Sequence, residues 1–228
     1  MKRIGVLSSG GDTPGMNAAI RAVVKVAAEY GIEVFGIRHG YRGLIEGDMR
    51  ELTTDEVRNI AHKGGTILKT ARCKEFMVEE GQRRALLTAQ AFDLEGIIAI
   101  GGDGTMHGAG ALSKMGIPTI TLPGTIDNDL AYTDFSIGFD TAVNGVLTEL
   151  IKVRDTMVSH DRIGIVEVMG NKCGDIALHA GVAGSADFIL LPEMEFDIDV
   201  ICDQLIKNNI RNRKTSMIVL AEGAGKGD

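Results

Sequence analysis

The sequence predicts an α/β fold made of two similar three-layer α/β/α doubly wound domains with mainly parallel sheets. Short apolar runs alternate with longer segments of helical periodicity, which is the element order of such folds. Several of the runs are apolar on both faces, as strands of a buried parallel sheet are. Glycine is abundant, with 30 in 228 residues, against a usual share of about 7%. These glycines cluster directly after apolar runs, where loops approach ligands closely.

Seven apolar runs have the length and composition of strands. They are short and rich in Val, Ile and Leu. The predicted strands are residues 3–7, 33–37, 96–100, 118–122, 162–168, 187–191 and 216–220.

The first helix has the clearest pattern. Its apolar stripe consists of Met16, Ile20, Val23, Val24 and Ala27. This spacing places all five side chains on one helix face. Pro14 suits the first turn, and Gly31 suits the C-terminal cap. Further helices are predicted at residues 54–62, 82–92, 105–115, 139–159, 174–183 and 197–209.

A domain boundary is predicted at Gly138, which precedes the long helix. The two Rossmann-like domains are then residues 1–138 and 139–228. No internal repeat, linker or low-complexity segment interrupts this division.

Composition excludes several function classes. The net charge is −7 and there is no Trp, so neither nucleic acid nor an anionic membrane is an expected partner. The three cysteines are far apart and form no C-x-x-C pair, which favours a reducing cytoplasm. The apolar stretch at the N-terminus is too short for a signal peptide, and no run reaches the roughly 18 residues of a membrane span.

Two glycine-rich turns each follow a predicted strand. The first turn, SSGGDTPG, spans residues 8–15. Its N–H groups and the following helix N-terminus could face an anion, although a tight turn without a ligand fits equally well. The second turn, GGDGT, spans residues 101–105. Its glycines leave room for a polyphosphate, and Asp103 offers the hard oxygen ligand that Mg²⁺ prefers. The alternative role for Asp103 is a helix cap.

The second turn is not a Walker A loop, because it lacks that motif's Lys. GGDGT after a strand resembles a superfamily of kinases that includes phosphofructokinases, NAD kinases and lipid kinases. A nucleotide-dependent phosphoryl transfer is therefore expected.

A carboxylate-rich motif, PGTIDND, follows the next strand at residues 123–129. An alcohol that attacks phosphorus must lose its proton, so such a reaction needs a base within hydrogen-bond reach. Taken alone, the motif is better interpreted as an Asx-rich turn. Combined with GGDGT, it is similar to the signature of the phosphofructokinase family, and specifically of its ATP-dependent bacterial members.

The resemblance implies a reaction and its site, which lies in the cleft between the two domains of this family. Mg-ATP would phosphorylate the 1-hydroxyl of fructose 6-phosphate, the committed step of glycolysis. Asp127 would be the proton acceptor, assisted by Thr125, Asp129 and Arg72, and Asp103 would engage Mg²⁺. The implied ATP contacts are Gly11, Tyr41, Arg72, Cys73, Gly102, Asp103, Gly104, Thr105 and Gly108. The implied sugar-phosphate contacts are Thr125, Ile126, Asp127, Arg162, Met169, Gly170, Asn171 and Glu222.

Two glycines favour ATP over pyrophosphate. Pyrophosphate-dependent relatives typically carry Asp at the position of Gly104 and Lys at that of Gly124. An Asp at position 104 would repel the α-phosphate of ATP, and a Lys at 124 would add charge for a small polyanion. Pyrophosphate-dependent phosphofructokinase remains the runner-up. A third alternative is a nucleotide-binding module without catalysis, because chains of this family are longer and this one ends just after Glu222.

Bacterial relatives also form homotetramers that bind ADP or phosphoenolpyruvate at a subunit interface. The residues that match this effector site are Arg21, Lys25, Arg154, Ser185, Asp187, Arg211, Arg213 and Lys214. Solvated helix faces are the simpler interpretation of these charges. Thr54 and Asn171 stand where many relatives carry Arg, which weakens the expected effector response and sugar affinity.

Overall fold

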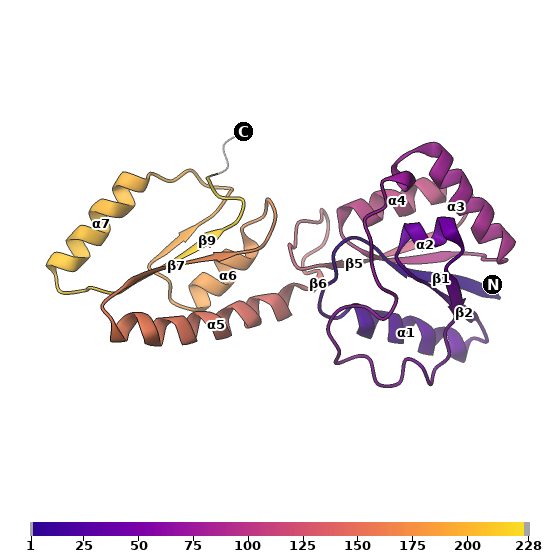
Figure 1. Ribbon diagram of the computed structural model, residues 1–228, viewed down its shortest axis with the longest axis horizontal. Coiled ribbons are helices and arrows are strands. Elements are labelled where there is room, and N and C mark those ends of the chain that lie inside the picture. The colour runs from indigo at the N-terminus through magenta and orange to yellow at the C-terminus, as the bar shows by residue number, and fades with distance from the viewer. Residues whose placement is uncertain (1, 226–228) are drawn as a thin grey trace. The chain divides into compact units, whose positions relative to one another are not determined.

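The computed structural model describes residues 2–225. It forms two compact units (Figure 1). Unit 1 comprises Met1–Thr125 with Ser136–Gly138, and unit 2 comprises Ile126–Phe135 with Phe139–Asp228. The division at residue 138 predicted from the sequence placed 126–135 in the first domain, whereas these residues pack with unit 2. The expected α/β class with mainly parallel sheets is confirmed.

Unit 1 is built on a six-stranded sheet of order β3-β2-β1-β4-β5-β6. Its strands are β1 (Arg3–Ser8), β2 (Glu33–Ile37), β3 (Met49–Glu51), β4 (Ile97–Gly101), β5 (Thr119–Thr125) and β6 (Ile137–Gly138). All neighbours are parallel except β2 and β3. The chain runs outward from β1 in both directions, first to β2 and later to β4. The loops after β1 and β4 therefore flank the switch point, where doubly wound sheets bind ligands.

Helices cover both faces of this sheet, as Figure 1 shows. One face carries α1 (Met16–Glu29), and the other carries α2 (Tyr41–Glu46), α3 (Glu79–Ala91) and α4 (Asp103–Lys114). Side chains along β1 point to the two faces of the sheet in turn. Ile4 and Val6 pack in the core beneath α1, and Leu7 packs in the core beneath α2, α3 and α4. A short 3-10 helix, Glu75–Met77, precedes α3.

The first helix follows the sequence prediction closely. Met16, Ile20 and Val24 are at most 2% exposed, and Gly31 has the left-handed φ of 66° expected of a terminating glycine. The helix predicted at 54–62 is wrong. Val57 and Ile60 are buried at helical spacing, but this segment forms isolated turns. Turns are favoured over a continuous helix by residues 53–55 at the beginning of this segment and by the glycine pair at 64–65 after its end.

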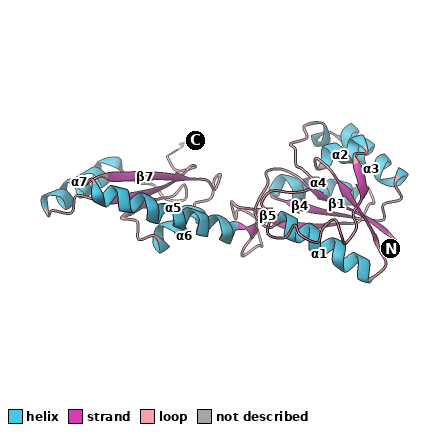
Figure 2. Ribbon diagram, turned by 60° about the horizontal axis from the view of Figure 1, so that its bottom comes forward, coloured by secondary structure: helices cyan, strands magenta, loops and turns pink. Residues whose placement is uncertain are grey.

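Unit 2 has a three-stranded parallel sheet of order β7-β9-β8. Its elements are α5 (Phe139–Ser159), β7 (Ile163–Val168), α6 (Asp175–Ala183), β8 (Phe188–Leu190), α7 (Ile198–Ile210) and β9 (Ser216–Ala221). Figure 2 shows α5 and α6 running along the sheet. Their buried side chains, including Phe139, Leu150 and Ile176, form one core with Met217 and Val219 of β9.

The remaining face of this sheet is less covered. Ile163 and Ile165 of β7 are 51% and 66% exposed, and α7 has no buried residue. Within residues 2–225, no helix is both long and apolar enough to cross a membrane.

Candidate active site

The two glycine-rich turns lie side by side in unit 1. β1 and β4 are neighbours with Ser8 opposite Ile100, so the turns leave the same edge of the sheet. The hydroxyl of Thr105 donates to the carbonyl oxygen of Ser9 at 3.0 Å and thereby ties the turns together. Gly101 permits this approach, because a Cβ at that position would lie 2.6 Å from the Ser9 oxygen. The structure thus joins two motifs that the sequence shows about 90 residues apart.

Tyr41 holds the second glycine turn through a hydrogen bond to Thr105. Its side chain is buried at 4% exposure, stacks on Phe76 with ring centroids 4.1 Å apart, and donates its hydroxyl to the Thr105 carbonyl at 2.6 Å. Burial raises the pKa of this phenol well above its usual value. Gly108 lies against the same ring. The Tyr41 hydroxyl therefore positions the second turn through Thr105, and the direct ATP contact that the resemblance implies stays a prediction.

Replacing Tyr41 with Phe should destabilise unit 1. The Thr105 carbonyl would lose a buried donor, which costs about 1–2 kcal/mol in free energy of unfolding. Urea denaturation measures this loss. Tyr30→Phe is the matched control, because Tyr30 is 75% exposed and should tolerate the same change. Equal stability of the two variants would remove the support role from the Tyr41 hydroxyl.

The loop that carries Arg72 is attached to the first glycine turn. Thr70 donates its hydroxyl to the Gly10 carbonyl at 2.7 Å. Ser8 and Thr66 also share a hydrogen bond of 2.8 Å between their hydroxyls. Arg72 is exposed, while Cys73 packs against the core of unit 1. The loop therefore places the Arg72 guanidinium near the first glycine turn, and Cys73 anchors the loop by packing against the core.

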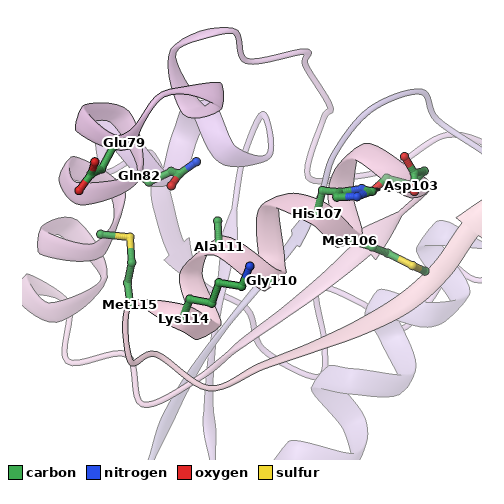
Figure 3. Close-up of a pocket in the computed structure, with 9 residues that line it drawn as sticks. All are labelled: Glu79, Gln82, Asp103, Met106, His107, Gly110, Ala111, Lys114 and Met115. Carbon is green, nitrogen blue, oxygen red and sulfur yellow. Dashed lines mark hydrogen bonds and ion pairs between the residues drawn. The ribbon is translucent and has the colours of Figure 1, made fainter.

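Asp103 begins α4 and lies at the edge of a cavity of about 670 Å³. Figure 3 shows the lining residues, which come from α3, from α4 and from the residue directly after α4. They are Glu79, Gln82, Asp103, Met106, His107, Gly110, Ala111, Lys114 and Met115. The Asp103 carboxylate is 68% exposed and lies 3.3 Å from the Nδ1 atom of His107. Cavities of this size hold small organic ligands.

The carboxylate chemistry of Asp103 suits Mg²⁺, but as one ligand of several. Among residues 2–225, no cluster of three or more His, Cys, Asp or Glu side chains could hold a metal by itself. Mg²⁺ typically uses one or two carboxylates together with phosphate oxygens and water. An exposed carboxylate at a helix N-terminus beside a glycine turn fits that pattern.

Thr125 lies at the end of β5, the neighbour of β4 in the sheet. A Cβ on Gly102 would lie 3.5 Å from the Thr125 Cβ, so the PGT end of the carboxylate motif adjoins the GGDGT turn. The hydroxyl of Ser136 donates to the Thr125 carbonyl at 2.6 Å and holds the strand end. In unit 1, the structure thus brings together the predicted residues Gly11, Gly102, Asp103, Gly104 and Thr125.

The rest of the carboxylate motif belongs to unit 2. Ile126 packs against the core of this unit, and Asp127 is half-buried. Asp129 accepts a long hydrogen bond of 3.5 Å from the Asn171 side chain. Glu222 accepts the backbone N–H groups of Gly170 at 3.1 Å and Asn171 at 2.6 Å. One carboxylate oxygen therefore shapes the 169–171 turn, a role that the sequence did not suggest.

Arg162 lies apart from the other predicted sugar-phosphate contacts. It immediately precedes β7, whereas the 169–171 turn follows the same strand. A strand of this length spans about 20 Å. The resemblance grouped Arg162 with Gly170, Asn171 and Glu222, but within one chain the structure does not bring Arg162 to them.

The predicted effector residues fall into separate groups. In unit 1, Arg21 and Lys25 lie on α1, and among the described residues the buried Arg21 Nε atom has no hydrogen-bond partner. In unit 2, Arg154 donates to the Ser185 carbonyl at 2.8 Å, and Asp187 accepts the Met217 N–H at 2.8 Å. Arg211 follows α7, while Arg213 and Lys214 line a cavity of about 290 Å³.

Known proteins share both the sequence and the fold of this chain. The family model for phosphofructokinase matches residues 3–228. An ATP-dependent 6-phosphofructokinase of Clostridium botulinum strain Hall is 54% identical over 225 residues, which are 99% of this chain and 70% of the relative.

Solved structures extend the likeness. A phosphofructokinase from Saccharomyces cerevisiae has a TM-score of 0.90 at 33% identity, covering 98% of this chain and 34% of its own. A pyrophosphate-dependent phosphofructokinase from Marinobacter aquaeolei has a TM-score of 0.86 at 25% identity, covering 98% of this chain and 61% of its own. On the strength of the family match and this 54% identity, the chain belongs to the phosphofructokinase family.

Proposed function

We propose that the protein transfers the γ-phosphoryl group of Mg-ATP to the 1-hydroxyl of fructose 6-phosphate. The observation that carries this proposal is the joined pair of glycine turns beside Asp103 and Thr125, at the switch point of the unit 1 sheet. The name of the 54% identical relative, ATP-dependent 6-phosphofructokinase, supports the same reaction.

Unit 1 would bind the nucleotide. The backbone N–H groups of the two turns and the α4 N-terminus provide donors and partial positive charge for phosphate oxygens. The cavity beside Asp103 is large enough for the nucleoside. Asp103 would hold Mg²⁺, which supplies charge neutralisation at the phosphates. Arg72, exposed on its attached loop, would neutralise charge on the transferred group.

Unit 2 would supply the acceptor side. Asp127 takes the proton of the attacking hydroxyl, Ile126 lies next to it in the chain, and Asp129 is held beside Asn171. Thr125, the last residue of β5 in unit 1, would contact the transferred phosphoryl group or the sugar. The sugar phosphate would contact the 169–171 turn that Glu222 shapes. The position of Arg162 suits a site in a second copy of the chain better than the one in its own.

A coupled assay that detects ADP tests the proposal. Fructose 6-phosphate with Mg-ATP should give steady turnover, and pyrophosphate in place of ATP should give little. The pyrophosphate assay is included because a solved pyrophosphate-dependent phosphofructokinase has a similar fold. Turnover with pyrophosphate alone would establish the runner-up, and no turnover with either donor would leave a nucleotide-binding module.

We further propose a cytoplasmic homotetramer regulated by ADP or phosphoenolpyruvate. The free thiols of Cys73, Cys173 and Cys202 suit a reducing compartment. Exposed apolar side chains on α7, including Ile206 and Ile210 at 58% and 79%, suit contact with another subunit. Arg154 beside Ser185 and the Arg213–Lys214 pair offer cations for a phosphorylated effector.

A further inference from the structure

The loop of residues 126–135 is attached to unit 2 on both sides of Asp127. On one side, Ile126 packs against the hydrophobic core of the unit. On the other, the Asn128 side-chain amide donates to a carboxylate oxygen of Asp175 at 2.8 Å. The same amide donates to the Asp134 carbonyl at 3.3 Å, which closes the loop on itself. Because Ile126 and Asn128 are both attached to unit 2, they fix the backbone direction at Asp127 between them.

Asp175 is a rigid point of attachment. It is the first residue of α6, and the next two residues, Ile176 and Ala177, are 1% and 0% exposed. The N–H group of the preceding Gly174 is held by Glu193 at 2.7 Å. A side chain fixed on a packed helix orients its partner better than one on a loop.

Asn128 is suited to receive this contact. Its φ of 55° lies in the left-handed region, which Asn tolerates better than most residues. A hydrogen bond from an amide to an ionised carboxylate belongs to the stronger class. The bond therefore stabilises a backbone conformation that the loop would otherwise adopt at a cost.

We propose that Asn128 and Asp175 form a positioning pair that orients the Asp127 carboxylate for proton acceptance. The inference rests on the proposed function of Asp127. Neither member of the pair touches the reacting atoms. Their effect passes through the loop backbone, and a displacement of about 1 Å at a catalytic group can cost about 10²-fold in rate.

Four variants separate this role from general stability. Asp175→Ala removes the acceptor, and Asn128→Asp sets two carboxylates against each other. Each should lower kcat by about 10²-fold, while the Kd for Mg-ATP stays unchanged. Asp175→Asn keeps an oxygen acceptor and should remain within about threefold of the parent. The exchange Asn128→Asp with Asp175→Asn restores one amide–carboxylate bond, so it should recover about tenfold over Asn128→Asp alone.

The matched control is Asp199→Ala. Asp199 also lies in the first turn of a unit 2 helix, α7, so its loss removes the same helix-dipole stabilisation. Its kcat should equal that of the parent. If Asp175 served only its helix, Asp175→Ala and Asp199→Ala would both lower Tm and leave kcat intact, and the exchange variant would recover nothing.

Hydrogen–deuterium exchange gives a readout that does not depend on turnover. Asp175→Ala should raise exchange in residues 126–135, and Asp199→Ala should not. If Asp175→Ala raises exchange in residues 126–135 but the parent protein has no kinase activity, the positioning pair is upheld and the proposed function is overturned. Unchanged exchange and unchanged kcat in an active enzyme would overturn the pair and leave the proposed function standing.

Discussion

Asp127→Ser should lower kcat by about 10²–10⁴-fold, the usual contribution of a positioned general base. The KM values for both substrates should change little, because the carboxylate acts mainly in the transition state. Serine cannot accept the proton, yet it is small and polar enough for a half-buried position. Steady-state kinetics with each substrate varied in turn gives the comparison.

Asp140→Ser is the control for this change. Asp140 is exposed, lies in the first turn of α5, and is outside the motif, so its replacement should leave kcat intact. If Asp127→Ser instead raised the KM for fructose 6-phosphate and kept kcat, Asp127 would be a sugar contact and a different group would be the base.

Gly104→Asp should lower kcat/KM for ATP by about 10²-fold or more. A carboxylate at this position would face the phosphates, and like charges in close contact cost several kcal/mol, where about 1.4 kcal/mol is tenfold. The fold should tolerate the change, because a Cβ on Gly104 meets no atom within 4 Å. Gly124 is a poorer test, since its Cβ would lie 3.0 Å from Ile100.

Gly145→Asp makes a matched control for this charge. Gly145 is exposed on α5 and a Cβ there also meets nothing within 4 Å. It therefore carries the same new charge in open space, and its ATP kinetics should equal those of the parent. Unaltered ATP kinetics in Gly104→Asp would mean that position 104 does not face the nucleotide.

The sequence predicted those parts of the fold that depend on local patterns. Short apolar runs identified seven of the nine strands in residues 2–225, and the 3.6-residue stripe of Met16, Ile20 and Val24 identified α1. The same rule failed at 54–62, because Val57 and Ile60 are buried at helical spacing within turns. Short elements such as α2 and β3 carry too few residues to show a period.

Local sequence patterns did not predict the long-range contacts of the site. Nothing local shows that the Tyr41 hydroxyl meets Thr105, that Glu222 shapes the 169–171 turn, or that Asn128 meets Asp175. These contacts depend on which strands become neighbours, which the motifs alone do not specify. The motifs did indicate the chemistry, since phosphate and proton transfer require Gly, Asp and Arg in those loops.

A crystal structure with Mg²⁺, a non-hydrolysable ATP analogue and fructose 6-phosphate would test the proposed reaction at its centre. A carboxylate oxygen of Asp127 should lie about 2.6–3.2 Å from the sugar's 1-hydroxyl, with the metal on Asp103 and the analogue's γ-phosphoryl group in line with that hydroxyl. A bound sugar whose 1-hydroxyl lies out of hydrogen-bond reach of Asp127, or an analogue bound away from the glycine turns, would contradict it.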